Sequence, residues 1–403
     1  MMSKNSPELR FQGFTDDWEQ RKLGDISYKV KEKNKTGEFT ETLTNSAEYG
    51  IINQRDFFDK DISNAKNLTG YYVVKNDDFV YNPRISNFAP VGPIKRNKLG
   101  KTGVMSPLYY VFRTHDIDKN YLEKYFDTVY WHRFMKLNGD SGARADRFAI
   151  KDSVFVEMPI PYPTIEEQQK IGTFFKHLDD TIALHQRKLD LLKEQKKGFL
   201  QKMFPKNGEK VPELRFAGFA DDWEERKAGD IFKNVSDKGY SDLPVLSASQ
   251  ELGMIRRDEI GIDIKYDEAS TKNYKRVQPG QFVIHLRSFQ GGFAWSDIEG
   301  ITSPAYTVLD YKEPNRYNSD FWKVVLTSPT FITRLETVTY GIRDGRSISY
   351  TDFSSLKLTA PSLAEQQQIG TFFAHLDTLI SLHQRKLDLL KEQKKGFLQK
   401  MFV

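Results

Sequence analysis

The sequence contains no cysteine among its 403 residues. Disulfides and thiolate metal sites are therefore excluded, and the composition fits a reducing cytoplasm. No apolar run reaches the roughly 18 residues that a membrane-spanning helix needs. The opening residues, MMSKNSPELR, also lack the apolar stretch of a signal peptide, so we expect a cytoplasmic protein.

A strong excess of basic charge is also missing. The net charge is +5, and none of the four sections into which we divide the chain below is strongly basic. If this chain binds nucleic acid, it must do so with local patches of charge. The seven histidines are scattered and form no H-E-x-x-H zinc motif.

Catalytic motifs begin in several places but are incomplete. LGKT (99–102) ends like a phosphate-binding loop, but Lys95 stands where that loop needs its first glycine. DEAS (267–270) resembles a helicase motif without a phosphate-binding loop to serve it, and YNPR (81–84) lacks the second proline and the aromatic residue of an amino-methyltransferase motif. The sequence therefore favours a binding protein, with no catalytic residue and no metal site.

The dominant feature that is present is an internal repeat. LHQRKLDLLKEQKKGFLQKMF (184–204) recurs unchanged at 382–402. PELRFQGFTDDWEQRKLGDI (7–26) recurs as PELRFAGFADDWEERKAGDI (212–231), with 16 of 20 positions identical. Each half of the chain therefore begins and ends alike.

The segments between these flanks match faintly but keep their register. At a constant shift of 203 residues, matched positions extend from Leu43 and Leu246 to Arg84 and Arg287. This pattern indicates one fold carrying different surface residues in the two halves. It predicts four parts, namely a first module at 1–163, a central repeated helix at 164–204, a second module at 205–361 and a C-terminal repeated helix at 362–403.

Each module is expected to be mixed α/β with short strands. DDFVYNPR (77–84) and GQFVIHLR (280–287) have the composition of a strand followed by a loop. Apolar residues at helical spacing predict a helix within 120–137 and a similar one within 318–338. Trp18 and Trp223, inside the repeated flanks, are expected to anchor the cores.

The repeated tails predict two long helices. TIEE (164–167) and SLAE (362–365) each follow a proline and have the spacing of a capping box, in which the hydroxyl and the carboxylate both accept backbone N–H groups. Some 40 residues would span about 60 Å. Because the two halves are alike, we expect the helices to pack against each other antiparallel, related by a pseudo-twofold axis, with the modules at opposite ends.

Four-three spacing of apolar residues predicts a coiled-coil seam along both helices. The first helix supplies Ile171, Phe175, Leu178, Ile182, Leu189, Leu192, Phe199 and Met203, and the second supplies Ile369, Phe373, Leu376, Ile380, Leu387, Leu390, Phe397 and Met401. His185, Lys196, His383 and Lys394 interrupt this stripe. They fix the register, contact a partner, or lie at the rim with their stems along apolar surface.

The order of these motifs resembles the specificity subunit of a type I restriction-modification enzyme. The resemblance covers nearly the whole chain and rests on the repeated PELRFxGFxDDWExRK opening, the PTIEEQQKI and PSLAEQQQI helix starts, and the LLKEQKKGFLQKMF ends. It implies two target recognition domains, each reading one half of a split, asymmetric DNA site, with the helices setting the gap. Half-sites one turn apart are separated by ~34–36 Å, within the reach of such helices.

The resemblance also implies partners and the division of chemistry among them. Two modification subunits would methylate adenine with S-adenosylmethionine, and two restriction subunits would supply the ATP- and Mg-dependent nuclease. This chain would bind double-stranded DNA, hold no cofactor of its own and have no catalytic site.

Polar and basic loops at equivalent places in the two modules are the candidates for DNA contact. Arginine can bond to guanine and asparagine or glutamine to adenine at base edges, while other contacts go to phosphates. The candidates are Asn45, Ser46, Asn82, Arg84, Asn87, Ser141, Arg144 and Arg147 in the first module, and Ser249, Gln250, Arg287, Ser288, Gln290, Arg343 and Arg346 in the second.

Two other functions remain open from the sequence. A coiled-coil adaptor that binds only proteins would suit the repeat and the helices, but it would leave the matched Arg/Ser/Gln loops without a purpose. A single-chain methyltransferase or nuclease with an unrecognised site is the other. Methyl transfer or cleavage by the isolated chain distinguishes the enzyme, and selection from random DNA distinguishes the adaptor.

Overall fold

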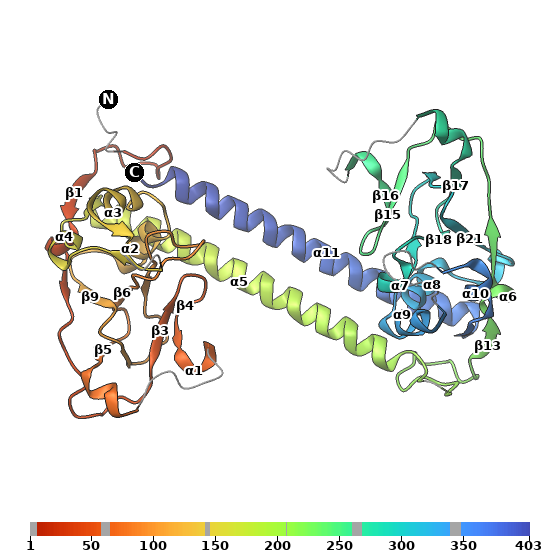
Figure 1. The fold of residues 1–403 in the computed structure, drawn as a ribbon, viewed down its shortest axis with the longest axis horizontal. Helices are drawn as coiled ribbons and strands as arrows, with labels where there is room; N and C mark the ends of the chain where they lie inside the picture. Colours follow the sequence, from red (N-terminus) through yellow and green to blue (C-terminus); the bar gives the residue numbers. More distant parts are fainter. Residues whose placement is uncertain (1–5, 58–64, 142–145, 207, 260–267, 339–347) are drawn as a thin grey trace. The chain divides into compact units, whose positions relative to one another are not determined.

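The computed structural model describes residues 6–57, 65–141, 146–206, 208–259, 268–338 and 348–403 (Figure 1). The chain forms two compact units, one made of Met1–Gln186 and Arg385–Val403 and the other of Arg187–Gln384. Each unit therefore contains one module, the first half of one long helix and the second half of the other. In the described ranges, no helix combines the length and apolarity needed to cross a membrane.

The first unit is built on antiparallel sheets, as its alternating β-branched and aromatic segments predict. Its four-stranded sheet contains β2 (Ser27–Lys29), β9 (Tyr110–Thr114), β6 (Phe79–Tyr81) and β7 (Ile94–Arg96), in that order. Two-stranded sheets pair β1 (Glu19–Lys22) with β12 (Pro159–Tyr162), β3 (Leu43–Ser46) with β4 (Gly50–Asn53), β5 (Tyr72–Val74) with β8 (Gly103–Met105), and β10 (Asp140–Ser141) with β11 (Phe148–Ala149).

The second unit repeats this strand order. Its four-stranded sheet contains β14 (Phe232–Val235), β21 (Thr307–Tyr311), β18 (Phe282–Ile284) and β19 (Ala294–Trp295). Two-stranded sheets pair β13 (Glu224–Lys227) with β22 (Lys357–Ala360), β15 (Leu246–Ser249) with β16 (Gly253–Arg256), and β17 (Lys275–Val277) with β20 (Gly300–Thr302). The predictions of one mixed α/β fold in both modules and of a strand in each matched segment are confirmed.

The predicted module helices are each broken into two. α2 (Lys119–Phe126) and α3 (His132–Asn138) replace the helix expected within 120–137, and α8 (Ser319–Leu326) and α9 (Pro329–Leu335) replace its counterpart. The break before α9 is local, because Ser328 caps that helix through its hydroxyl and proline occupies its first turn. Apolar spacing continues across the break, which is why the sequence indicated one helix.

Shorter helices complete the modules. α1 (Gln54–Phe57) and α4 (Asp152–Phe155) lie in the first unit, and α6 (Ala228–Ile231), α7 (Ser288–Gly291) and α10 (Tyr350–Ser355) lie in the second. Aromatic rings fill both cores. Phe79 stacks on Phe112 at 5.5 Å in the first unit, and Phe232 meets Trp322 edge-on at 5.4 Å in the second. Trp18 and Trp223 are buried, as predicted.

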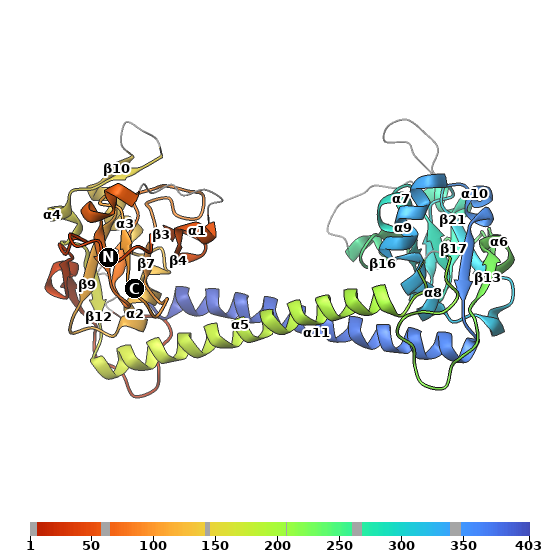
Figure 2. The same ribbon diagram turned by 90° about the horizontal axis from the view of Figure 1, so that it is seen from below.

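The long helices are α5 (Ile165–Lys202) and α11 (Leu363–Lys400). In the first unit the end of α11 packs beside the start of α5, where the Phe174 and Phe397 rings are 5.0 Å apart (Figure 2). In the second unit, the end of α5 packs beside the start of α11, and Phe199 lies 4.9 Å from Phe372. In each unit the end of one helix therefore lies beside the start of the other. The prediction that the helices pack antiparallel is confirmed.

The predicted seam residues share a low exposure. Buried members are Ile171, Phe175, Leu189, Leu192, Met203, Ile369, Phe373, Leu376, Leu387, Leu390 and Met401, and half-buried members are Leu178, Ile182, Phe199, Ile380 and Phe397. His185 and His383 are also half-buried. Lys196 and Lys394 form ion pairs across the helix pair, with Asp377 and Asp179 respectively. The two ion pairs occupy equivalent positions in the repeat.

The repeated flanks fasten each module to its helix through a buried carboxylate. Arg10 donates two hydrogen bonds to Glu167, at 2.7 and 2.8 Å, and Arg215 donates two to Glu365, both at 2.7 Å. Only the hydroxyl half of the predicted capping box forms, because Glu167 and Glu365 point to these arginines instead. The backbone N–H groups of Glu167 and Glu365 donate to the hydroxyls of Thr164 and Ser362, both at 3.4 Å.

The contacts of one glutamine and one glycine at each helix start explain why these two residues are the same in both copies. The Gln168 amide donates to the Pro163 carbonyl at 2.8 Å and accepts the Asp118 N–H at 2.9 Å, which ties α5 to the start of α2. At Gly172 an added Cβ would lie 2.5 Å from the Asp118 carboxylate. The second unit repeats both features with Gln366, Gly370 and Asn318.

Candidate nucleic-acid interface

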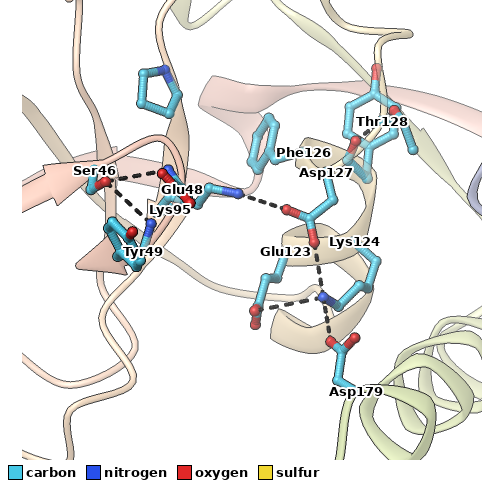
Figure 3. A network of polar contacts seen from close by, with 12 residues as sticks. Ser46, Glu48, Tyr49, Lys95, Glu123, Lys124, Phe126, Asp127, Thr128 and Asp179 are labelled. Carbon is cyan, nitrogen blue, oxygen red and sulfur yellow. Dashed lines mark hydrogen bonds and ion pairs between the residues drawn. The ribbon is translucent and has the colours of Figure 1, made fainter. Parts of the chain in front are cut away.

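The first candidate loop is the same tight turn in both units. The Ser46 hydroxyl accepts the N–H groups of Glu48 and Tyr49, at 3.3 and 3.2 Å, between β3 and β4 (Figure 3). The Ser249 hydroxyl accepts those of Glu251 and Leu252, at 3.4 and 3.2 Å, between β15 and β16. Each turn ends on a glycine with φ near +70°, a region that favours glycine. The scaffold is therefore constant, while the side chains that it displays differ.

The second candidate loop follows the central strands β6 and β18. The Asn82 side chain accepts the N–H of Arg84 at 3.0 Å, and the His285 imidazole accepts the N–H of Arg287 at 3.3 Å. Both arginines are exposed. Among the described residues, no carboxylate pairs with either guanidinium, so both can donate to an outside acceptor. Asn82 and His285 thus hold the backbone that presents these arginines.

In the first unit the three candidate loops come together. The Asn82 side chain donates to the Asn45 carbonyl at 2.8 Å, which joins the β3–β4 turn to the loop after β6. Arg84 pairs with Arg147 in an antiparallel bridge, and the Ile85 N–H donates to the Asp146 carbonyl at 2.9 Å. Two exposed arginines therefore lie opposite each other across one antiparallel bridge.

The second unit brings its first two loops together in another way. Gly291 in α7 lies against the Gln250 side chain, where an added Cβ would be 2.6 Å from Cγ. The Ser288 hydroxyl is buried and accepts the His285 N–H at 2.8 Å. Burial, followed by the charge of Arg287, lowers the pKa of His285 to about 4, so the imidazole is neutral at pH 7. Its Nε2 is buried without a hydrogen-bond partner in the described part of the chain.

The candidate residues differ in what they present to solvent. Exposed members are Arg84, Asn87, Arg147, Gln250, Arg287 and Gln290, half-buried members are Ser46, Asn82 and Ser249, and buried members are Asn45 and Ser288. Ser141 belongs to β10, while Arg144, Arg343 and Arg346 lie outside the described residues. Asn45 donates to the Val80 carbonyl at 2.7 Å, so it holds the loop in place.

Exposed apolar side chains lie beside the candidate loops, and the sequence-based prediction, which was limited to polar and basic residues, did not include them. Phe88 is 79% exposed at the tip of a turn closed by two backbone hydrogen bonds between Ser86 and Ala89. Tyr49 and Leu252 are also exposed at equivalent tips. Apolar contacts can read the thymine methyl group, so these residues extend the candidate surface. In the sequence, the aromatic residue within the loop-forming segment ISNFAP (85–90) indicates such an exposed side chain.

The incomplete phosphate-loop motif has a structural use. In LGKT the Gly100 N–H donates to the Asn76 side chain at 3.0 Å and is committed within the module. The residues that the structure describes contain no cluster of three His, Asp or Glu side chains that could hold a metal ion. A cavity of about 670 Å³ in the first unit is lined by residues that include Lys29, Tyr110 and Asp152, and Lys29 and Asp152 form an ion pair.

Comparisons with known proteins agree on one family. The model of the type I restriction modification DNA specificity domain matches residues 15–194 and again 220–392. The MjaVIII specificity subunit of Methanocaldococcus jannaschii is 21% identical over 417 residues, covering 97% of this chain and 93% of that protein. The MjaIX specificity subunit of the same organism is 27% identical over 198 residues, covering 45% and 41%. The crystal structure of the S subunit from M. genitalium aligns with a TM-score of 0.62 at 13% identity, covering 99% of both chains, and supports the fold.

Proposed function

Because the chain belongs to the family of type I restriction modification DNA specificity domains, we propose that it recognises a bipartite, asymmetric DNA site and reads one half with each module. One observation carries this proposal. The two units present the same turn between paired strands, and an exposed arginine, Arg84 or Arg287, at the same place after the matching central strand. The surrounding side chains differ, as reading of two different half-sites requires.

Base reading is assigned to the exposed residues, and positioning to the buried and half-buried ones. Arg84, Arg147 and Arg287 have the reach and the free donors to bond guanine in the major groove. Gln250 and Asn87 have the amide pattern that suits adenine. Asn45, Asn82, His285 and Ser288 hold the backbone from which these side chains project.

The helix pair is proposed to set the gap between the half-sites. A coiled coil packed along an apolar seam is stiff, so a change in its length moves one reading edge relative to the other. Modification and restriction subunits are the proposed partners, and they would carry the chemistry that depends on S-adenosylmethionine, ATP and Mg. Since its substrate is DNA and its partners act on DNA, the proposed location is the cytoplasm.

Selection from random DNA tests the proposal directly. The full chain is purified with its modification subunits, and bound sequences are collected and aligned. We expect a consensus of two unlike half-sites at a fixed gap. Replacing residues 27–162 with a module from another member of the family is expected to change one half-site and keep the other. Recovery of no bipartite consensus, with the modification subunits present, refutes the proposal and favours the adaptor.

A further inference from the structure

A chain of alternating charges crosses the first unit from its sheet to both long helices. Lys95 on β7 lies 2.8 Å from Asp127, Asp127 lies 2.9 Å from Lys124, and Lys124 lies 2.7 Å from Asp179 on α5 (Figure 3). Asp179 is in turn 2.7 Å from Lys394 on α11. We call these five residues the charge ladder.

The ladder is largely withdrawn from water. The Lys124 side chain is 6% exposed and sits among three carboxylates, the third being Glu123. Burial raises the pKa of Asp127, but Lys124 and Lys95 outweigh it and hold that pKa well below its usual range. Asp127 therefore remains charged near neutral pH. Such a network has a narrow range of geometries, because moving any member leaves a buried charge unpaired.

The sheet end of the ladder reaches the candidate interface. Lys95 pairs with Val80 in the β6–β7 register, and the Val80 carbonyl accepts a hydrogen bond from the side chain of Asn45, in β3 next to the β3–β4 turn. Asn45 also donates to the Pro93 carbonyl at 3.3 Å, two residues before Lys95. Figure 3 shows Lys95 extending from beside this turn to Asp127. The turn and the strand before Arg84 are thus held against the residue that starts the ladder.

Among its described residues, the second unit keeps the helix end of this arrangement. Lys196 and Asp377 repeat the pair of Lys394 and Asp179. At the positions of Lys124, Asp127 and Lys95, however, the second unit has neutral residues: Val324, Thr327 and Ala294. Val324 is buried, so this position in the fold accommodates an apolar side chain.

We propose that Lys124 and Asp179 are positioning residues that lock the reading edge of the first unit to the helix pair and so restrict the gap that this unit tolerates. The proposal rests on the function proposed above. A buried ion pair adds little net stability compared with an apolar replacement, but it fixes orientation where a packed apolar contact can slide. A gap that is one base pair too long moves a half-site by ~3.4 Å, which a locked edge cannot follow.

The test is Lys124→Met in the full chain purified with its modification subunits. This change removes the middle of the ladder but leaves Lys95 with Asp127 and Lys394 with Asp179, so no carboxylate of the ladder loses its last partner. The apolar twin at Val324 indicates that the variant folds. Lys176→Met is the matched control, since Lys176 lies on α5, the helix that carries Asp179, and pairs with Asp180 on the exposed surface.

Both variants are carried through selection from DNA pools in which the gap varies. For the Lys124→Met protein we expect discrimination against gaps one base pair longer or shorter to fall roughly tenfold, the scale of one mismatched pair. The preferred bases of both half-sites should stay the same. The Lys176→Met protein should keep the discrimination of the unaltered chain, because it loses the same positive charge but leaves the ladder intact.

Other outcomes overturn the proposal. Unchanged gap discrimination in Lys124→Met shows that the ladder does not position the reading edge. An equal loss of binding at every gap, with a lower melting temperature, shows a role in stability alone. If the unaltered chain selects no bipartite site, the proposed function fails first and the positioning role fails with it, so the two failures can be told apart.

Discussion

The two buried tryptophans of the repeated flanks should differ in how much they stabilise their units. The Trp18 indole N–H donates to the Glu167 carboxylate at 3.1 Å, as a third hydrogen bond beside the two from Arg10. The Trp223 indole N–H is buried and has no hydrogen-bond partner in the described part of the chain. Replacement of each tryptophan by phenylalanine therefore removes a charge-assisted hydrogen bond in one unit only.

The size of the difference follows from the acceptor. A hydrogen bond to a charged group contributes about 1.5–3 kcal/mol, and both substitutions lose a similar part of the ring. Trp223→Phe also removes a buried unsatisfied donor, which offsets part of its packing loss. We therefore expect Trp18→Phe to lower the free energy of unfolding of its unit by at least about 1.5 kcal/mol more than Trp223→Phe lowers that of the other.

Hydrogen exchange measured by mass spectrometry can follow each unit within the full chain. The amides of β6 and β9 report on the first unit, and those of β18 and β21 report on the second. The expected difference corresponds to a roughly tenfold or greater rise in the opening equilibrium of the first unit. In each variant the unaltered unit serves as the internal control. An equal or larger loss in Trp223→Phe would refute the assignment of the extra stability to the Glu167 hydrogen bond.

Other predictions use equally local contrasts. Gly172→Ala should lower the melting temperature and the free energy of unfolding, the latter by about 1–3 kcal/mol, because the added Cβ meets the N-cap carboxylate of α2. Gly198→Ala has open space around the added Cβ, so its higher helix propensity should raise the free energy of unfolding by about 1 kcal/mol. Arg84→Ala should relax one position of one half-site by about 1–3 kcal/mol in binding to substituted sites, and Arg287→Ala should relax one position of the other half-site only. Asp127 has a depressed pKa in the folded state, so its stabilising effect is complete above its unfolded pKa of about 3.9 and is lost as the pH falls through the folded value. Asp127→Asn should therefore flatten the fall in stability between pH 4 and pH 2 in acid titrations, and an unchanged slope would contradict the assignment.

The repeated parts of the fold were predictable because identity restricts them. The same string must satisfy the same neighbours twice, so the seam, the antiparallel pairing and the equal strand order follow from the alignment of the two halves. The double bond from Arg10 to Glu167 did not follow. The capping-box spacing pointed Glu167 to its own helix terminus, and a partner 157 residues away leaves no local signal.

The candidate interface was predictable as a set of loops but not as a set of exposed atoms. Asn45 and Arg84 both belong to polar segments, yet Asn45 is buried with its side chain bonded to the Val80 and Pro93 carbonyls, and Arg84 is exposed. The charge ladder was invisible for a similar reason. Lys124 lies on a helix with ordinary amphipathic spacing, and only the fold brings Asp179 beside it.

The unchanged 21-residue string can now be explained by what each copy touches inside its own unit. The end of α11 packs against the start of α5 in the first unit, and the end of α5 packs against the start of α11 in the second. The partner surfaces match at the contacting positions, since Phe174 and Asp179 correspond to Phe372 and Asp377. A substitution in one copy would mismatch a surface that the other copy still requires, so the fold penalises divergence of the buried and ion-pairing positions. The exposed positions of the string gain nothing from this packing. Their identity requires a second cause, and two like partners binding the two copies would supply one.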